Sequence, residues 1–172
     1  MEIKNHFGVY GVCYKHGCLL CIQKTSGPYK NRLDLPGGSQ QLDEGLTETL
    51  IREVLEETGY TVRSYSNLRI YDAFVREELT NFMVHHIMAF YDIEINEKEP
   101  QVVISEAVSD GANDSLGYIW MDIQEITEEN ASPLVLKVKS ELLGFPELDK
   151  TLYMNWKVND EKPTSSEWRK NS

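Results

Sequence analysis

Apolar positions along the first hundred residues follow a pattern typical of strands, interrupted by one helical segment. Residues 7–14 and 18–24 are rich in apolar side chains and are separated by a His-Gly pair, which predicts a β-hairpin. Residues 60–74 and 80–95 are longer runs of the same kind and predict two further strands. Residues 25–38 combine Gly, Pro, Ser and Asn, so we expect a loop there.

A helical pattern replaces the strand pattern between residues 43 and 58. Leu46, Leu50 and Val54 recur at every fourth residue and would lie on one face of a helix. Gly59 follows directly, and glycine readily adopts the left-handed conformation that ends many helices. We therefore predict one amphipathic helix with a face turned to the core.

The second half of the chain mixes the two patterns. Residues 105–117 have loop composition, and residues 117–122 read GYIWMD, which predicts a short strand. Ser132 and Pro133 are typical first residues of a helix, which we expect to run to Gly144. Strands and helices mixed in one short chain predict an α/β (α+β) fold.

Length and charge limit the classes of function. The chain has 172 residues, 41% of them apolar, and a formal net charge of -11. This length favours one domain, predicted at residues 1–145, with a partly flexible C-terminal extension at 146–172. The negative charge argues against binding of long nucleic acid or of an anionic membrane surface. No apolar run approaches the ~20 residues that span a bilayer.

The cysteines indicate the compartment. Cys13, Cys18 and Cys21 are an odd number without the spacing of a disulfide framework, and no secretory signal is visible, so we expect a cytoplasmic protein. Together with His16 they would offer zinc four ligands within nine residues. Structural zinc sites usually draw ligand pairs from separated segments, so packing of these cysteines in a sheet is the favoured interpretation.

Carboxylates are concentrated on the predicted helix. Glu53, Glu56 and Glu57 are three and four residues apart and therefore share one helical face, where their charges repel. A hard divalent cation with oxygen ligands relieves such repulsion, and Mg²⁺ is common where substrate phosphates complete its coordination. Arg52 lies four residues from Glu56 and can pair with it. Solvated acidic helices are common, so these glutamates alone do not decide between the two interpretations.

The spacing of particular residue types over residues 38–60 decides between a metal site and a solvated acidic helix. Five residues separate Gly38 from Glu44, and seven more separate Glu44 from the run REVLEETG, which begins at Arg52. This segment matches all seven fixed letters of the pattern G-x5-E-x7-R-E-U-x-E-E-x-G-U. A chance match is about 10⁻⁸ per window at ordinary residue frequencies. This segment resembles the Nudix box of the Nudix (MutT-like) hydrolases. The final position is a departure, because Tyr60 stands where the pattern has a bulky aliphatic residue.

The resemblance implies a fold, an activity and a set of site residues. The fold would be an α/β/α sandwich with a mixed central sheet. The activity would be hydrolysis of the pyrophosphate linkage in a nucleoside diphosphate or triphosphate derivative, by water attack on phosphorus with Mg²⁺ or Mn²⁺. Gly38, Glu53, Glu56 and Glu57 would hold the metal, and Glu53, Arg52 and Glu56 would be catalytic.

The general base and the number of metal ions stay open. Glu53 is the first choice for the base, because a carboxylate beside the attacking water can take its proton. In the family this role sometimes belongs to an acidic residue of a later loop. The corresponding candidates in the 105–117 loop are Glu106, Asp110 and Asp114.

Substrate recognition is less clearly marked. Arg32, Arg69 and Arg76 are candidate phosphate-binding residues, because guanidinium groups pair with phosphate oxygens. We expect a small nucleotide as the partner, with the particular derivative and a homodimer left open. The alternative function is a non-catalytic Nudix-fold module that senses a nucleotide. Such modules generally lose box glutamates, whereas this chain keeps them.

Overall fold

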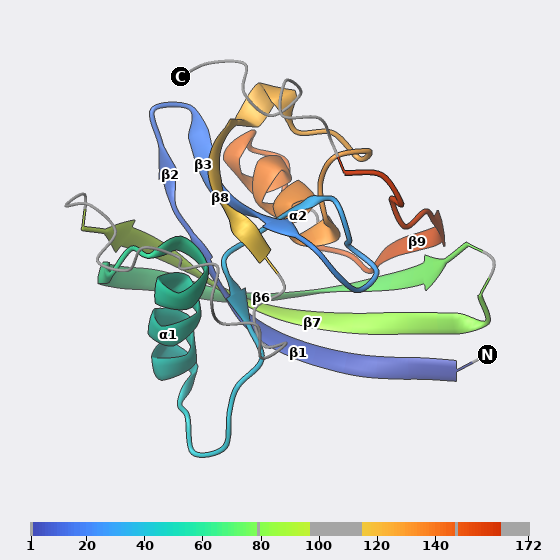
Figure 1. Ribbon diagram of the computed structural model, residues 1–172, viewed down its shortest axis with the longest axis horizontal. Coiled ribbons are helices and arrows are strands. Elements are labelled where there is room, and N and C mark those ends of the chain that lie inside the picture. Colours follow the sequence, from blue (N-terminus) through green and yellow to red (C-terminus); the bar gives the residue numbers. More distant parts are fainter. Residues whose placement is uncertain (1, 79, 97–114, 147, 163–172) are drawn as a thin grey trace.

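The computed structural model describes residues 2–78, 80–96, 115–146 and 148–162. Two β-sheets and two α-helices build this part of the chain (Figure 1). The elements are β1 (Glu2–Val12), β2 (Tyr14–Lys15), β3 (Cys18–Lys24), β4 (Leu33–Asp34), β5 (Gly37–Gly38), α1 (Leu46–Thr58), β6 (Val62–Glu77), β7 (Phe82–Ile95), β8 (Ser115–Asp122), the 3₁₀ turn η1 (Ile123–Glu125), α2 (Pro133–Leu142) and β9 (Thr151–Trp156).

The larger sheet is mixed, in the order β5-β1-β7-β6-β9. β1 runs parallel to β7, whereas β6 runs antiparallel to β7. β9 adds a second parallel pair at the edge of β6. The smaller sheet joins β2, β3 and β4, with β8 paired to β3. The predicted mixed α+β class is confirmed.

The two helices cover opposite faces of the larger sheet. Val9 and Ala89 pack with Leu50 and Val54 of α1 in one apolar cluster. Their neighbours Tyr10 and Phe90 pack with the buried residues of α2 in the other cluster. Because successive strand residues point to opposite faces, this division places the sheet between α1 and α2, which lie apart in Figure 1. The arrangement is the predicted α/β/α sandwich.

The predicted hairpin of residues 7–14 and 18–24 is wrong in its pairing. Residues 2–12 form β1 of the larger sheet, and only the two residues of β2 pair with β3 across the turn. The chain changes sheets at Cys13, whose carbonyl still accepts a hydrogen bond from Leu20 N (2.9 Å). An apolar run predicts a strand but not its partner, and each residue of β1 pairs with a residue of β7 that is eighty positions later.

The predicted loop 25–38 contains two short strands, so that prediction needs correction. β4 pairs with β3, and β5 pairs with β1 where Tyr10 faces Gly37. Gly37 has φ +149°, and a Cβ there would lie 2.2 Å from Val9 O. Only glycine permits this approach, so turn composition conceals a strand pairing.

Both helices begin and end close to the predicted residues. α1 begins at Leu46 rather than near Asp43, with Gly45 as N-cap and its N–H donating to the Glu48 carboxylate (2.7 Å). Gly59 ends α1 with φ 74°, as predicted. Ser132 caps α2 through Val135 N. No helix among the described residues is long and apolar enough to cross a membrane.

The predicted boundary at residue 145 stays a prediction. Within the predicted extension, β9 pairs with β6 and places Trp156 in the larger core. Residues 151–156 are therefore part of the central sheet. The predicted loop acids Glu106, Asp110 and Asp114 lie outside the described residues.

Candidate active site

Two glycines hold the loop before α1 against the helix. Gly37 N donates a hydrogen bond to the Glu57 carboxylate (2.8 Å), which is buried. A Cβ on Gly38 would lie 2.8 Å from Glu53 Cδ and from Glu53 Oε1. The glycine pair therefore lets the backbone approach two glutamates of the box closely.

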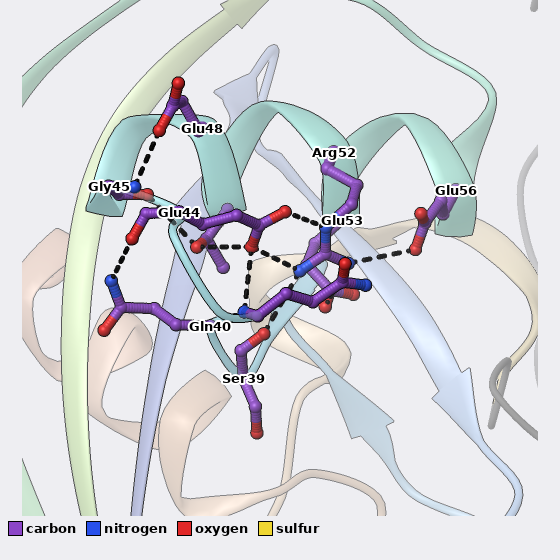
Figure 2. Close-up of polar contacts among 10 residues, drawn as sticks. Ser39, Gln40, Glu44, Gly45, Glu48, Arg52, Glu53 and Glu56 are labelled. Atoms are coloured by element: carbon purple, nitrogen blue, oxygen red, sulfur yellow. Dashed lines mark hydrogen bonds and ion pairs between the residues drawn. The ribbon is translucent and has the colours of Figure 1, made fainter.

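Arg52 gathers three carboxylates around one guanidinium group, as Figure 2 shows. Its Nε lies 2.5 Å from Glu44 Oε1. Its Nη1 lies 2.8 Å from Glu53 Oε1 and 3.2 Å from Glu56 Oε2. Oxygens of Glu53 and Glu56 therefore converge on a single cationic nitrogen.

Glu44 anchors the loop to this cluster. Its carboxylate accepts hydrogen bonds from Gln41 N (3.0 Å) and Thr49 Oγ1 (2.9 Å) as well as from Arg52 Nη2 (2.9 Å). Arg52 Nη2 also donates to Ser39 O (3.1 Å). The Arg52 hydrogen bond, with help from Gln41, lowers the pKa of Glu44 to about 2. Glu44 thus fixes Arg52 in position.

The three metal-ligand candidates differ in environment. Burial raises the pKa of Glu53, although Arg52 opposes the shift. The Glu56 side chain is 53% exposed, whereas Glu57 is buried against Gly37. Burial therefore increases the proton affinity of Glu53, a property that suits a general base.

A match to a known protein family covers the candidate site and most of the chain. The family description of the NUDIX domain matches residues 3–139, which is most of the chain. The chain belongs to the Nudix family. The Nudix pyrophosphohydrolase class that the box predicted is therefore confirmed.

A curated relative and two solved structures resemble this Nudix chain. The ADP-ribose pyrophosphatase of Methanocaldococcus jannaschii is 34% identical over 65 residues, which are 38% of each protein. A MutT Nudix hydrolase from Burkholderia pseudomallei has a TM-score of 0.60 at 18% identity, over 80% of this chain and 97% of that one. The Nudix domain of Shewanella oneidensis NrtR, complexed with ADP ribose, has a TM-score of 0.57 at 14% identity, over 82% and 88%. The two structural matches show the fold.

The donor set of the Nudix box fits a hard divalent cation. Glu53, Glu56 and Glu57 offer only carboxylate oxygens, and the backbone of Gly38 lies directly beside Glu53. Among the described residues, no three His, Cys, Asp or Glu side chains already converge as a metal site. The Arg52 contact shows how two of the carboxylates reach one positive centre. The cysteine-rich segment shows no zinc arrangement within the same described part, with Cys13 and Cys21 buried in the cores.

Arg32 lies away from the Nudix box and is buried by other parts of the chain. Its guanidinium donates to the backbone oxygens of Glu128, Glu129 (2.7 Å) and Lys157 (2.9 Å). It also stacks over the Trp156 ring, 4.2 Å from the centroid. These contacts join the segment before α2 to the segment after β9.

Arg69 and Arg76 lie far apart on β6. Arg69 forms two bonds to the Glu141 carboxylate (2.6 and 2.7 Å) and one ion pair with Asp92 (2.9 Å). Arg76 is seven residues further along β6, about 23 Å at the usual rise of a strand. Arg69 and Arg76 therefore do not share one site, and phosphate binding by each of the three arginines stays a prediction.

Sequence reasoning missed a buried polar chain beneath the glycine pair. The hydroxyl of Tyr10, whose backbone pairs with Gly37, lies 2.8 Å from His86 Nε2. Tyr29 contacts the other ring nitrogen of His86 (3.1 Å). Burial lowers the pKa of His86, so its ring is neutral. The signal in the sequence was only that adjacent His85 and His86 must face opposite sides of a strand.

Proposed function

We propose that this Nudix protein is a Mg²⁺-dependent pyrophosphohydrolase acting on a nucleoside diphosphate or triphosphate derivative. The observation that carries the proposal is the convergence of Glu53 and Glu56 on one Arg52 nitrogen, beside the glycine pair. Membership of the Nudix family supports it independently. The ADP-ribose named for two of the similar proteins makes an ADP-ribose-like compound the first substrate to test.

The side chains of the box provide positioning and charge. Glu53, Glu56 and Glu57 would hold a Mg²⁺ or Mn²⁺ ion, which would polarise phosphoryl oxygens and favour ionisation of water. Glu53 would take the proton of the attacking water as the water oxygen forms a bond to phosphorus. The bridging P–O bond then breaks, and the second phosphate leaves with the bridging oxygen. Phosphoryl transfer asks little else of a protein beyond holding these groups in line.

Arg52 acts as the positioning residue in this scheme. It contacts Glu53 and Glu56 from one side while Glu44 and Ser39 O fix its other nitrogens. A guanidinium group suits this role because its donors point in fixed directions. Rotation of either glutamate away from the substrate would break a charge-assisted hydrogen bond.

A matched set of glutamine variants tests the proposal. Glu56→Gln and Glu57→Gln remove charge at nearly constant shape, and we expect both to lower the rate of Mg²⁺-dependent release of nucleoside monophosphate from ADP-ribose or from a nucleotide panel by at least about 10²-fold. Glu48→Gln on the same helix is the control, because glutamine can still accept from Gly45 N. Wild-type rates in both box variants would overturn the metal-ligand assignment.

The alternative of a nucleotide-sensing module gives a different result in the same assay. Nucleotide binding by the wild-type protein with no turnover on any substrate would favour the module. The cytoplasmic location and the homodimer stay predictions, and a fractionation and a sedimentation measurement would test them. The identity of the metal is open to the same assay, with Mn²⁺ in place of Mg²⁺.

A further inference from the structure

One long edge of the larger sheet is open. β5 pairs with β1 only at Val9 and Tyr10, and among the described residues no strand pairs with that side of β1 before Val9. β1 is the outer strand of the sheet there, as Figure 1 shows. The open edge comprises residues 2–8, which have strand conformation throughout. Such an edge presents backbone N–H and C=O groups to which another strand can bind.

The backbone groups on this edge belong to alternate residues. Gly11 N donates a hydrogen bond to Pro36 O, on the β5 side of the strand (2.9 Å). Glu2 N donates to the residue before β7, on the other side (3.0 Å). These directions alternate along a regular strand, so the odd-numbered residues direct N–H and C=O to the open edge. They are Ile3, Asn5 and Phe7.

The β1 edge lacks the features that usually prevent strand pairing. Its register with β7 is unbroken from Glu2 to Val12, and it contains no proline. By contrast, β9 at the opposite edge of the sheet has six residues and a shifted register against β6. The part of β6 beyond β9 also has two register shifts. Short or bulged strands protect a sheet edge, whereas a long regular strand pairs readily.

The open segment is complementary to itself in one antiparallel register. A twofold axis at Asn5 places Ile3 of one copy opposite Phe7 of the other, so the outward N–H and C=O groups of both copies form hydrogen bonds. Ile3, which is 51% exposed, is then covered by an aromatic ring. A shift by two residues brings Lys4 opposite Lys4, and the reverse shift brings Ile3 against Val9, which β5 already covers.

We propose that two copies of this chain form a twofold-symmetric dimer through residues 3–7 of β1, which joins their larger sheets into one. Residues 2–7 contain one acidic residue, Glu2, and one basic residue, Lys4, in a chain of net charge -11. Repulsion between two acidic copies is therefore low at this edge. Twofold symmetry is the commonest arrangement of identical subunits. The dimer goes beyond the proposed hydrolysis, because none of these residues belongs to the Nudix box.

Sedimentation equilibrium with two variants of Asn5 tests the dimer. Asn5→Pro removes the outward N–H, and we expect it to raise the dimer Kd about tenfold or more. Asn5→Ala keeps the N–H and should stay within about threefold of the wild-type Kd. Both variants lose the side-chain contact with His85 (3.2 Å), so they are matched. Proline is tolerated in edge strands, and circular dichroism checks that the variant is folded.

Two results of this measurement would overturn the proposal. One is a wild-type mass of a single chain at concentrations up to about 100 µM. The other is an equal Kd in Asn5→Pro and Asn5→Ala, which would place any dimer contact elsewhere on the molecule.

Cysteine cross-linking tests the register in the folded protein. The two Asn5 Cα atoms would be about 5.5 Å apart, which a disulfide can span. Asn5→Cys should therefore give a cross-linked dimer under mild oxidation, in a protein whose partly exposed Cys18 is replaced by serine. Glu2→Cys is the control, because the two Glu2 residues would be about 20 Å apart. Equal cross-linking of both variants, or none in Asn5→Cys, would refute the register.

The dimer and the proposed function fail independently. Glu56→Gln should have the wild-type dimer Kd even without turnover, because Glu56 lies on α1. Loss of the dimer in Glu56→Gln, with Asn5→Pro still dimeric, would place the interface at the box and overturn the proposal. A wild-type protein that dimerises through β1 but hydrolyses no nucleotide would leave the dimer standing.

Discussion

Two arginines, Arg52 on α1 and Arg69 on β6, each hold carboxylates, and the two clusters differ in how their charges balance. Arg52 contacts Glu44, Glu53 and Glu56. The carboxylates around Arg69 are those of Asp92 and Glu141, and the Tyr71 hydroxyl donates a further bond to Glu141 (2.5 Å). The first cluster therefore has two more negative charges than positive ones, whereas the second has one.

The excess negative charge supports the proposal that the first cluster binds a cation. Three carboxylates around one guanidinium repel one another unless further positive charge arrives. At Arg69, both oxygens of Glu141 are occupied, and the cluster joins β6, β7 and α2. The contacts of Arg69 therefore tie elements of the fold together, whereas the larger charge excess around Arg52 supports the proposed cation site.

Removing one carboxylate from each cluster should separate the two roles most strongly. We expect Glu56→Gln to lower kcat by about 10²–10³-fold, because transition-state charge loses its stabilisation. We expect Glu141→Gln to leave kcat near the wild-type value but to lower the free energy of unfolding by about 1.5–3 kcal/mol. Initial rates and urea unfolding of both variants make the comparison. Equal effects on rate in the two variants would contradict the division.

Metal binding should sharpen the contrast in thermal stability. At a hundredfold excess of Mn²⁺ or Mg²⁺ over its Kd, binding adds about 2.7 kcal/mol, which raises Tm by about 5–10 °C for a chain of this size. The rise should be much smaller in Glu56→Gln and unchanged in Glu141→Gln. Differential scanning calorimetry with and without EDTA measures it. A full shift in Glu56→Gln would exclude Glu56 as a ligand.

Gly38→Ala tests whether space beside Glu53 matters. The new Cβ would lie 2.8 Å from Glu53 Cδ and must displace that side chain. We expect metal affinity and kcat to fall by about 10–100-fold, the range for lost support of a metal ligand. Gly45→Ala is the control, because its Cβ meets nothing closer than 3.4 Å, at Glu48 Oε2. Equal activity losses in the two variants would point to a general effect on the loop.

Acid titration should give the smallest effect. Arg52 lowers the pKa of Glu44 to about 2 from the usual 4.5, so the contribution of this carboxylate to stability is complete above pH 4.5. That contribution is lost as the pH falls through about 2. We therefore expect the stability difference between the wild-type protein and Glu44→Gln to shrink over this range. Carbon NMR of the Glu44 carboxyl group would contradict the prediction if it titrated near 4.5.

Local patterns predicted what depends on neighbouring residues. The box is contained in residues 38–60, and Glu44, Arg52 and Glu56 meet because one loop and one helix bring them together. The helix end at Gly59 follows from its left-handed conformation, which is also a local property. Spacing along the chain therefore predicted most of the candidate site.

Distant pairings were not predictable in the same way. Nothing near Arg69 indicates Glu141, which is 72 residues away, and nothing near Arg32 indicates the carbonyl of Lys157. An arginine is equally suitable for a phosphate, a carboxylate or a backbone oxygen, so its residue type does not identify its partner. The pairing of β1 with β7 was missed for the same reason.

The sequence alone determined the acidic helix, its glycine-bounded loop and the family, because helix periodicity and close spacing fix which of these groups meet. Only the tertiary structure decided that Arg32 and Arg69 are enclosed by other elements, and that β5 covers β1 only at Val9 and Tyr10. The physical reason is that packing brings together residues from distant strands, and a strand pattern specifies a face but not the neighbour across it.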